Sequence, residues 1–245
     1  MCCFSRPVIS VTDTNLFARA SKDGRQFLVY SMKLDTKEEL AMLLPIPVPK
    51  ASKEDAVRFI NLEKYAEFFD QMRVGFPVPL PPRGGDKNTR PTLTPLKVVE
   101  VGSFVASFVP SVADFRRLDE RFRLPTEVWD KLPAYKDFGF AVFQLKKGAQ
   151  KVHPMAFEFP RANPQQLFFP TVHIHDGTVK AMAHFHHMLF CQKSAGEDLM
   201  NWQESTRPAG MYMKNLDVAQ GIVDPAGHCY KKVMIGDFKN VDILV

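Results

Sequence analysis

Short stretches rich in β-branched and aromatic residues recur along this sequence, separated by turn residues. Alternating apolar residues of this kind are typical of strands that lie half-buried on a sheet. A turn at residues 22–24 separates two of the longest stretches. We therefore predict an α+β fold with strand-rich, mostly antiparallel sheets and a few helices. The main predicted strands are VISV, TNLFARA, RQFLVYSMKL, AMLLPIPV, FGFAVFQLKK and KVHPMAFEF.

Two other stretches have the spacing of helices. In residues 52–72 apolar side chains recur every three to four positions, and residues 111–122 form a similar stretch with Ser111 as N-cap. Between them, residues 76–95 are dense in proline and glycine, which predicts a long loop. Because strand-like stretches occur on both sides of this loop, we expect residues 1–245 to form a single domain.

Composition and charge narrow the class of protein. With 45% hydrophobic and 24% charged residues, the chain has an ordinary globular composition. We find neither a secretion signal nor an apolar run long enough to span a membrane, so we expect a cytoplasmic protein. The chain has 32 Lys and Arg residues and 27 Asp and Glu residues, and the excess of positive charge is spread along the sequence. Because nucleic-acid binders concentrate positive charge in a patch or stripe, this distribution argues against nucleic-acid binding. Substrate and oligomeric state stay open.

The segment from His173 to His187 carries five of the seven histidines. An Asp-Gly pair at 176–177 lies between its alternating runs, which predicts a β-hairpin with a two-residue turn. Alternation then places one set of histidines on a polar face and His187 with the apolar core, where we expect a neutral, hydrogen-bonded imidazole. The polar-face set is His173, His175, His184 and His186.

The leading functional hypothesis is a metal-binding protein, and a metalloenzyme if a metal-bound water is its reagent. His173 and His175 are roughly 7 Å apart on one strand face, so both can reach one ion. The register separates His184 from His173 by roughly 14 Å, so one ion cannot bind all four histidines. Imidazole suits a divalent transition metal, namely Zn, Cu, Fe or Ni. Candidates for a third ligand are His184, His186, His228, His153, Cys2, Cys3 and Cys229. The alternative is that these histidines are solvated surface residues.

Four motifs together resemble an uncharacterised family of bacterial proteins: MCCFSRPV at the start, AMLLPIPVP, VHPMAFEFP and VHIHDG. The similarity runs along most of the chain. The cysteine pair, the following strand and the apolar-proline run also resemble, more loosely, a second bacterial domain family. Neither resemblance implies a reaction, a cofactor or a catalytic residue.

The amino-terminal cysteines suggest a second functional hypothesis. Removal of Met1 would leave Cys2 with a free α-amino group, which can act as base for its own thiol. The run NLFARASKDG contains Arg19 and Asp23 and resembles the choloylglycine-hydrolase group of amidases, which implies an N-terminal-cysteine amidohydrolase using these three residues. The alternatives are a buried cysteine pair, lipidated cysteines or metal ligands. A noncatalytic interaction module is the third functional hypothesis.

Overall fold

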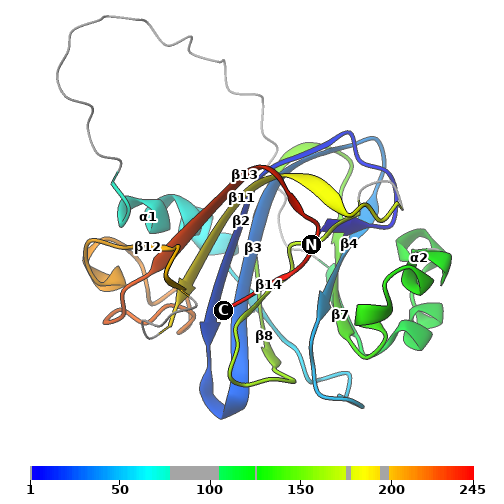
Figure 1. Ribbon diagram of the computed structural model, residues 1–245, viewed down its shortest axis with the longest axis horizontal. Helices are drawn as coiled ribbons and strands as arrows, with labels where there is room; N and C mark the ends of the chain where they lie inside the picture. Colours follow the sequence, from blue (N-terminus) through cyan, green and yellow to red (C-terminus); the bar gives the residue numbers. More distant parts are fainter. Residues whose placement is uncertain (1, 78–104, 125, 175–177, 194–198) are drawn as a thin grey trace, which may run out of the picture.

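Two β-sheets pack face to face at the centre of the molecule (Figure 1). The computed structural model describes residues 2–77, 105–124, 126–174, 178–193 and 199–245. The larger sheet, here called sheet B, has the strand order β12-β13-β11-β2-β3-β8-β5, and the smaller sheet A has the order β10-β1-β4-β7-β6. Most neighbouring strands are antiparallel. This confirms the predicted strand-rich α+β fold.

The elements have the following bounds. Sheet B consists of β2 (Ser10–Ala20), β3 (Arg25–Thr36), β5 (Arg58–Asn61), β8 (Gly148–Pro160), β11 (Met182–Gln192), β12 (Gln203–Glu204) and β13 (Tyr230–Lys239). Sheet A consists of β1 (Cys2–Phe4), β4 (Leu40–Ile46), β6 (Val105–Val109), β7 (Gly139–Leu145) and β10 (His173–Ile174). A separate antiparallel pair joins β9 (Phe168–Phe169) to β14 (Ile243–Leu244). The helices are α1 (Phe68–Val74) and α2 (Thr126–Asp130), with short 3-10 turns η1 (Lys22–Gly24), η2 (Glu63–Tyr65), η3 (Val112–Arg117), η4 (Glu120–Phe122), η5 (Pro133–Tyr135) and η7 (Ala209–Met211).

The β2–β3 hairpin is the clearest case of local sequence setting local structure. Its strands pair from Ser10 with Asp35 to Ala20 with Gln26, and the turn between them is η1. The turn requires a positive φ at Asp23 (55°) and Gly24 (72°), which aspartate and glycine tolerate better than most residues. The predicted turn at residues 22–24 is therefore confirmed.

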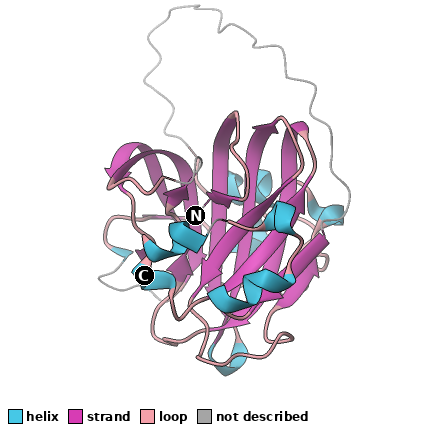
Figure 2. Ribbon diagram, turned by 90° about the vertical axis from the view of Figure 1, so that its right-hand side faces the viewer, coloured by secondary structure: helices cyan, strands magenta, loops and turns pink. Residues whose placement is uncertain are grey.

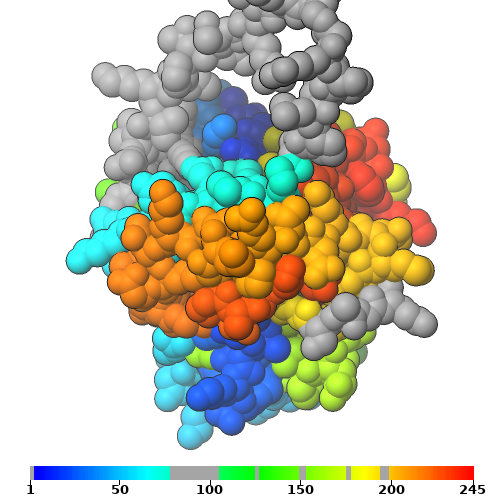
Figure 3. Space-filling view, turned by 90° about the vertical axis from the view of Figure 1, so that its left-hand side faces the viewer, coloured from blue at the N-terminus to red at the C-terminus, as the bar shows by residue number. Residues whose placement is uncertain are grey.

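Three apolar clusters hold the layers together. The first lies between the two sheets and includes Phe4, Phe157 and Phe185. The second joins the outer face of sheet B to α1 and to the segment 209–229, which cover that face together (Figure 3). The third joins the outer face of sheet A to α2 and the 3-10 turns beside it (Figure 2). Because both faces of each sheet are covered, the inner strands are apolar on both faces, and every residue of β4 is buried.

The two predicted helices are largely wrong. Residues 52–72 contain β5, then η2 and the first part of α1, because residues 58–61 pair with β8 and Phe59 packs on Phe143. The apolar residues of this stretch have the spacing of a helix, but pairing with β8 at the edge of the sheet makes residues 58–61 a strand. Residues 111–122 form only η3 and η4. Ser111 does precede the first of these turns, but its hydroxyl donates to the Asp114 carboxylate instead of capping it.

Part of the sequence predictions falls outside the described residues. This applies to residues 78–95 of the predicted loop, to His175 and to the Asp-Gly pair at 176–177. Within the described residues, no helix is long and apolar enough to cross a membrane.

Candidate functional site

The histidine-rich segment is divided between the two sheets. β10 lies at the edge of sheet A and pairs in parallel with β1, whereas β11 lies inside sheet B between β13 and β2. The predicted hairpin from His173 to His187 is therefore wrong. Within the described residues, β10 pairs with β1, whereas β11 pairs with β13 over residues 182–191 and with β2 over residues 187–192.

His173 and His187 meet across the space between the sheets. Their Nε2 atoms lie 3.0 Å apart, and both rings pack on Phe185, with centroid separations of 4.5 Å and 5.0 Å. His187 is 1% exposed, which confirms its expected place in the core. One ring must donate the shared hydrogen and the other accept it, so the two imidazoles hold opposite tautomeric roles. The sequence analysis did not foresee this pairing, because it placed the two histidines on opposite faces of one hairpin.

The other candidate histidines lie apart from this pair. His184 Nδ1 lies 2.9 Å from Asp237 on the exposed surface, and His186 Nδ1 accepts a hydrogen bond from the backbone N–H of Asp13. His228 Nδ1 lies 3.0 Å from the Ser205 carbonyl. Among the described residues, no three His, Cys, Asp or Glu side chains form a group that can hold a metal ion.

The three residues of the amidohydrolase hypothesis belong to different parts of the fold. Cys2 is in β1 of sheet A, where its backbone pairs with His173, and its neighbour Cys3 is fully buried. Arg19 lies near the end of β2 in sheet B, and its guanidinium donates to the carbonyls of residues 221 and 222. Asp23 is exposed in the β2–β3 turn. Arg19 therefore stabilises a backbone turn, and the described structure does not join it to the amino-terminal strand.

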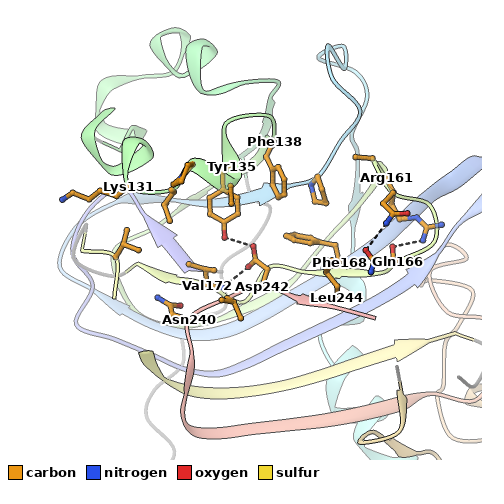
Figure 4. A pocket seen from close by; sticks show the side chains of 18 residues that line it. Lys131, Tyr135, Phe138, Arg161, Gln166, Phe168, Val172, Asn240, Asp242 and Leu244 are labelled. Atoms are coloured by element: carbon orange, nitrogen blue, oxygen red, sulfur yellow. Dashed lines mark hydrogen bonds between the residues drawn. The ribbon is translucent and has the colours of Figure 1, made fainter. Parts of the chain in front are cut away.

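An apolar pocket of about 520 Å³ lies beside the β9–β14 pair (Figure 4). It opens where η5 and the following loop face the β9–β14 pair and the start of β10. This volume lies in the range of small-molecule sites, roughly 300 to 1,000 Å³. Its apolar wall includes Leu132, Phe138, Phe168, Val172, Val179 and Leu244.

The buried Tyr135 and the partly buried Asp242 form a hydrogen-bonded pair that joins three segments at the middle of the pocket (Figure 4). The Tyr135 hydroxyl donates to one Asp242 oxygen at 2.6 Å, and the other oxygen accepts from the backbone N–H groups of Thr171 and Val172 at 2.8 and 3.0 Å. Burial first, and then the charge of Asp242, raise the pKa of Tyr135. Its hydroxyl therefore stays protonated and serves as a donor.

Cationic side chains mark the two ends of the pocket. Arg161 is half-buried at one end, where its guanidinium donates to the carbonyls of Gly24 and Gln166. Burial lowers the pKa of Arg161. Lys131 is exposed at the opposite end, with its amino group turned away from the cavity (Figure 4).

The sequence analysis did not find this pocket. Its residues come from segments around positions 131–138, 161–168, 172, 179 and 240–244, and none of these segments carries a motif that marks a binding site. The closing run VDILV contains both Asp242 and β14.

Comparison with known proteins gives a fold likeness only. No family model matches the chain. No curated protein matches it either. Among solved structures, it is similar to the crystal structure of baculovirus P35, with a TM-score of 0.51, 14% identity, and coverage of 96% of this chain and 95% of that chain. The caspase-8/P35 complex gives a TM-score of 0.49, with 13% identity and 95% coverage of each chain. A mutated baculovirus P35 after caspase cleavage gives 0.47, with 14% identity and coverage of 96% and 97%.

Proposed function

We propose that this chain is a noncatalytic interaction protein whose partner is a caspase-type cysteine protease. The observation that carries the proposal is the fold likeness to baculovirus P35, which extends over 96% of the chain. P35 has been solved in complex with caspase-8 and also after caspase cleavage. The likeness spans nearly the whole of both chains, and the binding role is carried over by analogy of fold alone. A caspase partner also agrees with the expected cytoplasmic location.

The sequence suggests where such a protease would act. Caspases cut peptide bonds that follow aspartate, and the proline- and glycine-rich residues 76–95 contain one aspartate, Asp86. The composition of this segment predicts a long loop, and loops with small and polar residues are favoured sites of proteolytic cutting. The proposal therefore includes cleavage after Asp86, with the cut chain remaining on the enzyme.

The test mixes the purified full chain with active caspase-8, separates the mixture by size and measures intact masses. We expect the chain to co-elute with the protease as fragments of residues 1–86 and 87–245. Asp86→Ala should abolish both cleavage and co-elution. Asp55→Ala is the matched control, because Asp55 is an exposed aspartate in the described turn before β5. Equal behaviour of the two variants, or no co-elution of the unaltered chain, would refute the proposal.

As a second candidate function, we propose that the amino-terminal edge of sheet A binds a divalent transition metal. The observation in its favour is the 3.0 Å separation of His173 and His187 Nε2. Two nitrogens bound to one tetrahedral zinc at about 2.0 Å are themselves about 3.3 Å apart, so a small adjustment would suit Zn, Cu, Fe or Ni. Cys2 pairs with His173 through the backbone, and we propose it as a further ligand together with His175, which lies outside the described residues.

Native mass spectrometry tests the metal proposal and the amidohydrolase hypothesis together. We expect the unaltered chain to take up one of these metals, His173→Ala to lose it, and His184→Ala to keep it because His184 lies on the outer surface of β11. A chain that takes up none of the four metals would contradict the metal proposal. Retained Met1 in the same spectrum would rule out catalysis by an amino-terminal Cys2.

A further inference from the structure

The pocket beside β9 and β14 has the form of a small-molecule site whose body is apolar. Its volume of about 520 Å³ is enclosed largely by aromatic and aliphatic side chains, among them Phe138, Phe168 and Val172. Burial of apolar surface here would drive binding of an apolar molecule, at roughly 25 cal/mol for each Å² removed from water. The apolar walls determine the shape and hydrophobicity of the ligand that fits. The polar groups at the ends of the pocket determine which head group binds.

Arg161 supplies a charge that suits an anionic head group. A guanidinium has five N–H donors. Within the described part of the chain, that of Arg161 donates to two backbone carbonyls and forms no ion pair with a carboxylate. A half-buried cation with neutral partners still favours a nearby anion, because charge-assisted hydrogen bonds are stronger than neutral ones. Asn163 and Gln166, hydrogen-bonded to each other, lie beside it and add amide groups to this end.

Asp242 sets the direction in which a ligand would lie. Its carboxylate faces the middle of the pocket and is fixed by Tyr135 and two backbone N–H groups (Figure 4). A second negative charge placed there would be repelled. An anionic head group is therefore favoured at the Arg161 end, and an apolar body is favoured along the rings toward Lys131.

We infer that this pocket binds an apolar carboxylate, of the class that includes medium-chain fatty acids. Its head group contacts Arg161, and its apolar body lies along the wall formed by Phe138 and Phe168, whose rings pack edge to face with centroids 5.9 Å apart. The site is separate from the caspase-binding role and does not depend on it.

Calorimetric titration of the full chain with decanoate tests the inference, with decylammonium as the probe of opposite charge. Decanoate should bind with saturation, and decylammonium should bind at least tenfold more weakly because Arg161 repels it. Failure of decanoate to bind, or equal affinity for both probes, would overturn the inference.

Two matched pairs of variants locate the site. Leu244→Trp should fill the pocket mouth and weaken decanoate binding at least tenfold, whereas Val233→Trp should leave it unchanged. The two residues are 53% and 49% exposed, so both variants are expected to fold, and only Leu244 lines the pocket. Equal affinities of this pair would place decanoate elsewhere and contradict the inference.

The second pair tests the charge at the end of the pocket. Arg161→Gln should weaken binding by about tenfold, the loss expected for one charge-assisted hydrogen bond. Arg116→Gln, an exposed site outside the pocket, should leave binding unchanged, and Arg161→Lys should restore most of the affinity. Unchanged binding by Arg161→Gln, or no difference between Gln and Lys at this position, would overturn the role of the charge. The tryptophan pair decides the outcome if Arg161→Gln does not fold.

Discussion

The histidine-rich segment and the apolar pocket are opposite cases of how chemistry is distributed along a chain. The histidines are close together in sequence, but β10 and β11 place them in different sheets. The pocket residues Tyr135, Arg161 and Asp242 are far apart in sequence, yet they line one cavity. The difference shows that sheet pairing, which depends on distant segments, decides which side chains form a site.

Two contacts made by histidines of this segment also differ, in how far they are exposed to water. His173 and His187 lie 3.0 Å apart, and His184 lies 2.9 Å from Asp237, so the separations are nearly equal. Their surroundings differ, because His187 is 1% exposed whereas the side chains of His184 and Asp237 are 73% and 74% exposed. Water and salt screen the outer pair, so we expect it to contribute little to stability.

The largest expected loss of stability comes from removing the ring of Phe185, which packs on both His173 and His187. Phe185 is fully buried and packs on His173, His187 and Phe238. Phe185→Ala should lower the free energy of unfolding by about 3 to 5 kcal/mol, through lost burial and the cavity left behind. Urea unfolding measures this loss. His184→Ala is the control and should cost no more than a few tenths of a kcal/mol. Similar losses of unfolding free energy for the two variants would contradict the difference between the buried His173–His187 pair and the exposed His184–Asp237 pair.

The next largest effect is the difference in stability between alanine variants of two aspartates, Asp242 and Asp237. Asp242→Ala should cost about 2 to 3 kcal/mol, because it leaves two backbone N–H groups and the Tyr135 hydroxyl without their acceptor. Asp237→Ala removes only the exposed contact with His184, and its cost should stay within a few tenths of a kcal/mol. The same unfolding experiment measures both. An equal cost for the two substitutions would contradict the central place of Asp242 in the pocket.

A smaller effect concerns Tyr135 and its dependence on pH. Tyr135→Phe removes the hydrogen bond to Asp242 and should cost about 1 kcal/mol at pH 7. Burial raises the pKa of Tyr135 in the folded chain. The unfolded chain therefore ionises first, so this contribution is complete below about pH 10 and is lost as pH rises further. Unfolding measured at pH 8 and pH 10.5 should show a shallower alkaline loss in Tyr135→Phe than in the unaltered chain. Identical losses would show that Tyr135 is accessible to water.

The sequence predicted those parts of the fold that depend on local patterns. β2 and β3 are rich in β-branched and aromatic residues, and Asp23 and Gly24 fit the φ values of the turn between them, so this hairpin needed no distant information. Residues 58–61 were misassigned because their spacing fits a helix, and only the neighbouring β8 makes them a strand. The burial of His187 was predicted from alternation, but its partner His173 was not, since contact between two sheets has no signal in either strand.

We propose that the whole fold serves to bind a caspase-type protease. Titrating the peptidase activity of a fixed amount of caspase-8 with increasing full chain tests it most directly, since a partner that stays in the substrate cleft blocks a peptide reporter. We expect caspase-8 activity to fall in proportion to the amount of chain added until it is lost. The Asp86→Ala variant should leave caspase-8 activity unchanged. Full caspase-8 activity in the presence of a large excess of the unaltered chain would contradict the claim.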